Sequence, residues 1–456
     1  MSKILRISLQ SKPVVALLLL FLGVAGSGWA QASANPELAR LIEQAREEGE
    51  VKVLVELEMS FRPETTLPDS AAIQAQRRVL RRTQNEILFR LRGFEVSGVR
   101  EFQYSPYLAL TLRVPALEAL SGLPQVRTVI EDRPEPPVLQ DSVPLIGADQ
   151  TGYHGAGYAV AVLDTGVDYG HGFVWGRLLS EACYSTNNVS YSSLCPGGAT
   201  SSTASGSGLD CTGSSSCSHG THVAGIAIGT CGFSNCCEGW GGVAISAGLI
   251  SIQVFSKHKT NGSLGSFQGD QIAALERVRD LVVAGNKVAA VNMSLGGGIF
   301  QNPCTGDARR PIVQDLTNLG VAVVIAAGNS GSSLGVAAPA CIPEAVTVGA
   351  TKKNDTVASF SNSDDQLDLW APGDGFTNLS GIESSVPDGC FEFLYGTSMS
   401  APHVAGAFAQ LRQKAPSATV GTLLTKLKNT GVPITDSRNG VTRSRIQLDA
   451  AINSLP

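Results

Sequence analysis

Apolar and polar residues are spaced differently in two parts of the chain. Between residues 35 and 140, Val51 to Glu58 alternates as a half-buried strand does, and Ile73 to Leu91 has apolar residues at helical spacing. Shorter patterns follow in the order strand, strand, helix and strand, at 94–104, 107–114, 115–122 and 126–131. This β-α-β-β-α-β order predicts a small α+β unit of the ferredoxin-like type.

From about residue 141 the apolar runs become continuous, which is typical of parallel strands buried on both faces. Such runs end at Asp164, Met293 and Ala326, and further strands are predicted near Val346 and Leu367. Helical patterns occur at 267–283, 308–319 and 400–413. Strands that alternate with helices predict an α/β fold with a doubly wound parallel sheet.

The first 34 residues have the composition of a signal peptide. Lys3, Arg6 and Lys12 precede an apolar run at 14–24, and small residues lead to Ala34, after which cleavage is predicted. The apolar run is too short to span a membrane, and no later segment reaches about 18 apolar residues. The sequence therefore predicts secretion, into the medium or the periplasm, without a membrane anchor once the signal is removed.

Composition changes at residue 35 and again near residue 140. Residues 35–140 are rich in arginine, poor in glycine and free of cysteine, which indicates a separate folding unit. The proline-rich segment 132–140 is predicted to be extended, because proline fits neither a helix interior nor a central strand. The predicted parts are therefore 1–34, 35–140 and 141–456. A net charge of −5 argues against a nucleic-acid partner.

Four segments of the third part carry residues suited to nucleophilic catalysis. Ser398 lies in a glycine-punctuated turn before a predicted helix, whose first turn contains Pro402 and whose N-terminus favours negative charge. His219 precedes a run of small residues and is the candidate base. Asp164, at the end of a buried strand, is the candidate orienting acid. Asn329, after another strand, has an amide to offer an oxyanion.

Together these segments resemble the subtilisin-like serine proteases, whose triad has the chain order Asp, His, Ser. The resemblance covers roughly residues 141–456. It implies that Ser398 is the nucleophile, His219 the base and Asp164 the residue that orients the imidazole. Asn329 and the Ser398 backbone N–H would form the oxyanion hole. The implied activity is that of a secreted, monomeric serine endopeptidase that cleaves proteins or peptides through an acyl-enzyme.

The unit at 35–140 resembles the inhibitory propeptide of the same family. An extended peptide is what a protease cleft binds, so self-cleavage is predicted between Val138 and Ser142, close to Leu139 or Gln140. The propeptide would then remain as an intramolecular inhibitor until it is degraded. The alternative is an ordinary N-terminal domain that stays attached.

The same segments contain residues that compete for these roles. Asp168 competes with Asp164 but suits a turn, and His222 and His403 suit a structural role within a core. An α/β-hydrolase would need glycine two positions after the nucleophile, where Ser400 stands. An inactive secreted binding protein with the protease fold is the alternative from another class of function, and the complete triad argues against it.

Weaker signals concern specificity. The segment 294–297, with the sequence Ser294-Leu295-Gly296-Gly297, resembles the exposed segment of the family that pairs with the substrate backbone. Alignment with the family places Ala337 near the floor of the first specificity pocket. No acid is evident there to select lysine or arginine, so a broad preference for apolar or uncharged side chains is predicted.

All ten cysteines lie between Cys183 and Cys390, and an even number in an exported chain predicts five disulfides. Cys304 and Cys341 follow the two loops beside the predicted pocket and are paired on that ground; the other pairings stay open. The spacings lack the paired C-x2-C units of zinc sites. The chemistry requires no cofactor. Structural calcium is compatible with the resemblance, but no ligands are predicted.

Overall fold

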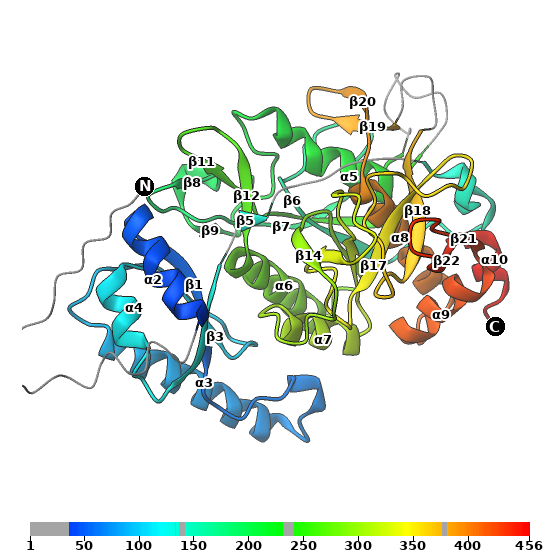
Figure 1. Ribbon diagram of the computed structural model, residues 1–456. Helices are drawn as coiled ribbons and strands as arrows, with labels where there is room; N and C mark the ends of the chain where they lie inside the picture. Colours follow the sequence, from blue (N-terminus) through cyan, green and yellow to red (C-terminus); the bar gives the residue numbers. More distant parts are fainter. Residues whose placement is uncertain (1–35, 133, 136–141, 231–240, 376–380) are drawn as a thin grey trace, which may run out of the picture.

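The computed structural model describes residues 36–132, 134–135, 142–230, 241–375 and 381–456. The predicted signal peptide at 1–34 and most of the predicted cleavage region lie outside these residues. In the described ranges, no helix has both the length and the hydropathy needed to cross a bilayer. A small N-terminal unit lies against a large α/β unit (Figure 1).

The N-terminal unit has the predicted β-α-β-β-α-β order. Its elements are β1 (Val51–Leu57), α3 (Ser70–Arg90), β2 (Val96–Glu101), β3 (Tyr107–Leu112), α4 (Val114–Leu120) and β4 (Val126–Glu131). They form an antiparallel sheet in the order β2-β3-β1-β4, which is the ferredoxin-like arrangement. An additional helix, α2 (Pro36–Glu48), was not predicted; its apolar side, with Leu38 and Leu41, packs on the core of this unit.

The large unit is built on one sheet of ten strands in the order β21-β22-β18-β17-β15-β13-β6-β10-β7-β9. From β22 to β7 all neighbours are parallel. The strands are β6 (Ala159–Asp164), β7 (Leu178–Tyr184), β9 (Ser201–Ser202), β10 (Gly248–Gln253), β13 (Val288–Met293), β15 (Ala322–Ala326), β17 (Val346–Lys352), β18 (Leu369–Asp374), β21 (Val432–Thr435) and β22 (Thr442–Arg445).

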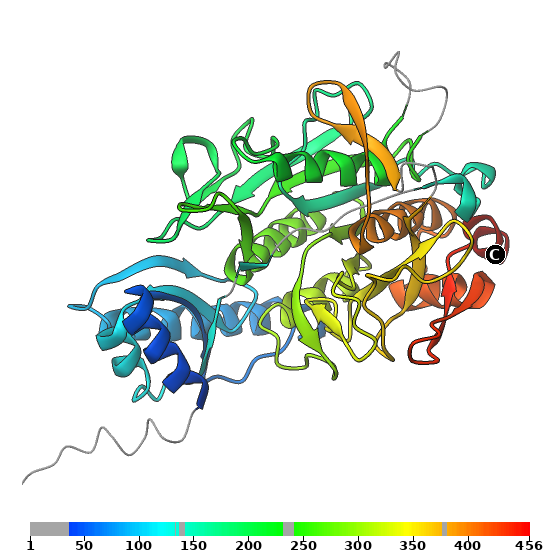
Figure 2. The same cartoon turned by 45° about the horizontal axis from the view of Figure 1, so that its top comes forward.

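Helices cover both faces of this sheet (Figure 2). α5 (His219–Ile228) and α8 (Thr397–Lys414) pack on one face together with α9 (Val420–Thr430) and α10 (Leu448–Asn453). α6 (Gln268–Val283) and α7 (Arg310–Asn318) cover the other face. On β6, Val160 and Val162 face the first layer, and Ala161 and Leu163 face the second. The predicted doubly wound α/β fold is confirmed.

Strand β1 differs from its prediction, because both of its faces are buried. Its alternate valines pack with the helices of the N-terminal unit, while Leu54 packs in a small cluster with Ile272 of α6. Lys52 is 7% exposed and lies between Asp132 and Asp270, at 3.0 and 3.8 Å. The half-buried prediction is wrong because the more polar face of the strand forms the interface with the large unit.

Three adjacent strands bring the predicted site residues together. β13 pairs with β6 on one side and with β15 on the other, all in parallel. The carboxyl ends of these strands therefore meet at one edge of the sheet. β6 ends at Asp164, β13 is followed by Ser294, and β15 is followed three residues later by Asn329.

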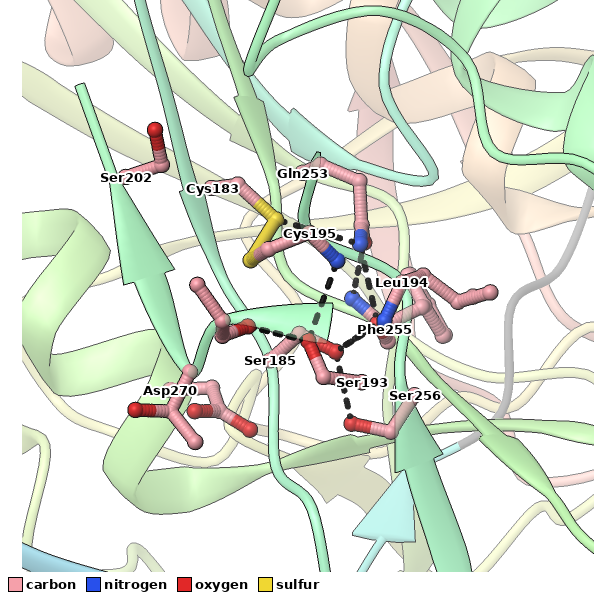
Figure 3. Close-up of a disulfide and its surroundings, with 12 residues drawn as sticks. Cys183, Ser185, Ser193, Leu194, Cys195, Ser202, Gln253, Phe255, Ser256 and Asp270 are labelled. Atoms are coloured by element: carbon pink, nitrogen blue, oxygen red, sulfur yellow. Dashed lines mark hydrogen bonds between the residues drawn. A yellow bond between two sulfur atoms is a disulfide. The ribbon is translucent and has the colours of Figure 1, made fainter. Parts of the chain in front are cut away.

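The Ser/Gly-rich insertion between β7 and α5 is attached to the same edge of the sheet. Figure 3 shows the Cys183–Cys195 disulfide beside Gln253, the last residue of β10. The Gln253 amide lies 3.4 Å from Cys183 Sγ, and the Ser185 hydroxyl donates to the Phe255 carbonyl at 2.7 Å. These contacts hold the start of the insertion against the end of β10, the strand next to β6.

Candidate active site

A buried carboxylate and an imidazole lie at the end of β6. The Asp164 Oδ1 atom is 2.5 Å from His219 Nδ1 and also accepts a 2.7 Å bond from the Thr165 backbone N–H. Asp164 is 0% exposed and His219 1% exposed. Because the carboxylate faces Nδ1, the imidazole donates its proton there, which makes Nε2 the nitrogen that can accept a proton.

Thr165 connects the end of β6 to the start of α5 through two hydrogen bonds. Its hydroxyl donates to the Cys217 carbonyl at 3.0 Å and accepts from the Gly220 backbone N–H at 2.9 Å. A Cβ on Gly220 would lie 2.1 Å from the Gly166 carbonyl oxygen, so only glycine fits at this contact. Cys217 is also bonded to Cys211. Sequence reasoning missed the part played by Thr165, although it lies directly after Asp164.

The nucleophile candidate, Ser398, is the second residue of α8 and is fully buried in the described chain. Its hydroxyl donates to the Ser294 carbonyl at 3.2 Å. The helix was predicted to start at Ser400, but it starts at Thr397. Pro402 is therefore in the second turn of α8, and its predicted position in the first turn is wrong. Ser398 still lies in the first turn of the helix, where the helix dipole favours negative charge.

Asn329 is held by the residue next to the nucleophile. Its Oδ1 accepts from the Thr397 backbone N–H at 2.9 Å and from the Thr397 hydroxyl at 3.0 Å. A backbone N–H can only donate, so the carboxamide atom facing it is the oxygen. The Asn329 amide nitrogen is then the end turned away from Thr397. Thr397 lies inside the motif that identified Ser398, but the sequence did not indicate this contact.

The predicted specificity segment also reaches this edge. β14 (Gly297–Phe300) pairs antiparallel with β16 (Val336–Ala338), which contains Ala337. A Cβ on Gly296 would lie 3.2 Å from Ala337 Cβ, and one on Gly328 would lie 3.0 Å from it. Segment 294–297, Ala337 and the Asn329 loop are therefore neighbours.

The prediction that the whole segment 294–297 is exposed is wrong. Ser294 and Leu295 are 0% exposed in this chain, and exposure begins at Gly297. Leu295 belongs to the core cluster that lies between the large sheet and α6 and α7. The apolar residue after β13 thus continues the core instead of facing the cleft.

The structure joins Cys304 to Cys341 with an S–S distance of 2.07 Å, in addition to Cys183–Cys195 and Cys211–Cys217. The other four cysteines are at positions where no side chain is described, so the expected total of five disulfides stays a prediction. Among the residues that the structure describes, no group of three or more His, Cys, Asp or Glu side chains is placed to hold a metal ion.

The competing residues lie in structural positions. His222 Nε2 is 3.0 Å from the Glu392 carbonyl, and His403 Nδ1 is 2.5 Å from the Met399 carbonyl. Both are completely buried, and burial lowers the pKa of His222 to about 3 and that of His403 to about 4. The Asp168 carboxylate accepts from Gly170 N at 3.0 Å within its own turn. These groups anchor the surroundings of the site.

Comparison with known proteins places this geometry in a family. The model of the subtilase family matches residues 155–447. An alkaline protease of Shouchella clausii is 33% identical over 348 residues, 75% of this chain and 78% of that protein. An extracellular serine proteinase of Thermus sp. (strain Rt41A) is 36% identical over 280 residues, 61% of this chain and 56% of that protein.

A solved structure shows the same fold. A protease from Pseudoalteromonas arctica PAMC 21717 aligns with a TM-score of 0.55 and 27% identity, over 69% of this chain and 94% of that one. The family match covers more than half of the chain and includes all four candidate residues. This chain belongs to the subtilase family and is a subtilisin-like serine endopeptidase.

Proposed function

We propose that the chain hydrolyses peptide bonds with Ser398 as nucleophile, His219 as general base and Asp164 as the group that fixes the imidazole. The observation that carries this proposal is the 2.5 Å contact between Asp164 Oδ1 and His219 Nδ1, at the same sheet edge as Ser398. A serine-directed phosphonate tests it. The label should be found on the peptide that contains Ser398, and labelling elsewhere would refute the assignment.

The proposed reaction has two steps, the acylation of Ser398 and the hydrolysis of the acyl-enzyme. His219 Nε2 takes the Ser398 proton as Oγ attacks the substrate carbonyl, and the resulting oxyanion accepts hydrogen bonds from the Asn329 amide and the Ser398 N–H. The imidazolium then protonates the departing amine, which leaves an acyl-enzyme. Water, deprotonated by His219, attacks the acyl group and releases Ser398. Asp164 stays ionised and stabilises the imidazolium throughout.

The N-terminal unit is proposed to be an inhibitory propeptide at 35–140. β5 (Pro134–Glu135) pairs antiparallel with β12 (Leu264–Phe267), so the chain that leaves the unit enters as a strand beside the large unit. The Asp132 carboxylate accepts from Gly269 N at 3.0 Å and thereby caps α6, whose own N-cap residue provides no side-chain bond. A peptide held as a strand in this way is poised like a substrate.

The proposed substrates are proteins or peptides with apolar or uncharged side chains near the cleaved bond. A hollow of about 460 Å³ lies beside β14 and is lined by Phe300, Pro303 and Ala338 among others. Its acid, Asp307, bonds to the Arg309 guanidinium at 2.9 and 2.7 Å. That carboxylate is already neutralised, so it gives little preference for basic residues.

Secretion is proposed from the signal-like residues 1–34 and from the similarity to an extracellular proteinase. The mature enzyme would then begin near residue 141. Disulfides in the described chain suit an oxidising compartment.

A further inference from the structure

The hairpin of β21 and β22 holds the loop that follows Asn329. Its tip carries Arg438, whose guanidinium donates to three main-chain carbonyls. These are Gly331 O and Ser359 O, each at 3.2 Å, and Ser361 O at 2.8 Å. Arg438 therefore ties the loop after Asn329 to a second loop at 359–363, although it lies 107 residues after Gly331 and 77 residues after Ser361.

A carboxylate balances the charge of Arg438 and fixes its orientation. Asp436, which is 1% exposed, lies 2.6 Å from Arg438 Nη2 and 2.9 Å from Nε, and it also accepts from the Ser363 hydroxyl. Burial opposes ionisation of Asp436, but the bonds from Arg438 and Ser363 outweigh it and lower the pKa of the carboxyl. The guanidinium is held in one orientation, in which its remaining N–H groups reach the loop carbonyls.

Asn362 carries the connection to the residues on either side of Asn329. Its Oδ1 accepts from Ser330 N and Ser332 N, both at 3.0 Å. Its backbone N–H donates to the Gly328 carbonyl at 2.9 Å. Asn329 thus lies between two residues that are bonded to Asn362, in a loop that Arg438 holds from the other side.

We propose that Arg438 is a positioning residue for the oxyanion hole, a role that rests on the function proposed for Asn329. A donor stabilises a developing oxyanion only if it is already in place, because reorientation during the reaction costs free energy. β15 ends at Ala326, so the sheet does not fix the following loop, and Gly328 adopts a φ of +102°. Thr397 holds Gly328 and the Asn329 side chain directly, and the bonds from Arg438 and Asn362 fix the loop on its other side. The guanidinium of Arg438 bonds Asp436 and loop carbonyls, so its effect on the reaction would pass through the loop.

The test is a double-mutant cycle on active-site-titrated, mature enzyme. Arg438→Gln, Asn329→Ala and the double variant are assayed for kcat and KM with a chromogenic peptide. Arg438→Gln should lower kcat about 5- to 30-fold with KM within about twofold. In the Asn329→Ala background the same change should alter kcat by less than about twofold, because the group it positions is gone.

Arg443→Gln is the matched control. This arginine is on the same hairpin and also donates to main-chain carbonyls, but these belong to Leu367 and Asp365. Its kcat should stay within about twofold of the parent enzyme. Equal losses of kcat for Arg438→Gln in both backgrounds, or equal losses for the two arginine variants, would overturn the inference. A normal rate for Asn329→Ala alone would instead overturn the proposed oxyanion hole.

If Arg438→Gln does not yield folded enzyme, Asn439→Ala replaces it. The Asn439 amide donates to the Ser333 and Ser363 carbonyls, both at 3.1 Å, and holds the same loop from the same tip. A loss of kcat of about 2- to 5-fold that disappears in the Asn329→Ala background supports the inference. An unchanged kcat, or a loss that persists in that background, overturns it.

Discussion

The Ser294 hydroxyl donates a 2.6 Å hydrogen bond to the main-chain carbonyl of Ser398. In a regular helix that carbonyl would accept from the residue four positions later, which here is Pro402 and has no N–H. Ser294 is in turn oriented by the Asn292 amide at 2.9 Å. A side chain that follows β13 therefore replaces the helical bond missing behind the nucleophile.

Loss of this hydrogen bond should lower the free energy of unfolding, and a second substitution should restore part of it. In the Ser398→Ala chain, which cannot digest itself, Ser294→Ala should lower the free energy of unfolding by about 1–3 kcal/mol, because the buried carbonyl loses its donor. Adding Pro402→Ala should recover part of this loss, since alanine restores the N–H. Denaturant titration measures both values.

Ser400→Ala is the control for that experiment, because Ser400 is another buried serine of α8 whose hydroxyl contacts the Ala371 and Pro372 carbonyls instead. The decrease in the free energy of unfolding caused by Ser400→Ala should be the same with and without Pro402→Ala. If Pro402→Ala changed both serine variants equally, the proposed replacement of the helical bond would be wrong.

Removal of the Asn329 amide should act on the transition state. Asn329→Ala should lower kcat about 10²- to 10³-fold with little change in KM, which is the loss established for the oxyanion-hole asparagine of subtilisin itself. Steady-state kinetics with a peptide substrate measure this. Asn362→Ala provides a comparison that leaves the Asn329 amide present, and its kcat should fall less.

Self-cleavage should require Ser398. The Ser398→Ala chain, purified without added protease, should keep residues 35–140 attached, because Ser398 is the residue proposed to attack the peptide bond. Mass spectrometry of the purified chain gives the answer. A precursor that still loses about 105 N-terminal residues would show that another protease, or another nucleophile, performs the cut.

Release of the cleaved N-terminal unit should depend on a buried ion pair. Glu64 lies 2.7 Å from Arg279 of α6 and is 4% exposed. Glu64→Ala removes a carboxylate that bonds Arg279 across the interface and Arg77 within the N-terminal unit, so it should weaken the inhibitory complex and shorten the lag before activity appears. Glu58→Ala is the control, because its partner Arg127 belongs to the same unit. Equal lags for both variants would contradict the prediction.

Acid should destabilise the fold through His222 and His403. Their folded-state pKa values are lowered to about 3 and about 4, below the ordinary value of 6.5. At pH values between the folded-state pKa and 6.5, the unfolded chain binds more protons than the folded chain. The free energy of unfolding therefore decreases as the pH falls below 6.5. From pH 6.5 to 5 each histidine should cost about 2 kcal/mol.

His222→Gln separates the two contributions. Glutamine can still donate to the Glu392 carbonyl, but it does not titrate. In the Ser398→Ala chain, this change should remove about half of the acid-induced loss in the free energy of unfolding that denaturant titrations detect at pH 6.5 and 5. An identical loss with and without His222 would exclude that imidazole as a source.

The order of the elements and the candidate catalytic side chains could both be predicted from local sequence patterns. Strand β6, with Asp164 at its end, and strand β13, which ends at Met293 before Ser294, end where they were predicted to end. This succeeds because buried parallel strands are continuous apolar runs, and because Asp164, His219, Asn329 and Ser398 each lie within a local turn or helix start that is encoded nearby.

Contacts between distant segments could not be predicted, because no local pattern contains them. The second buried face of β1 depends on α6, and the donor for the Ser398 carbonyl comes from Ser294, 104 residues earlier. Arg438 likewise reaches the Gly331 carbonyl across 107 residues. Hydrogen bonds between distant segments leave no periodicity in the sequence. They exist because adjacent strands deliver their ends to one edge of the sheet, where buried polar groups must find partners.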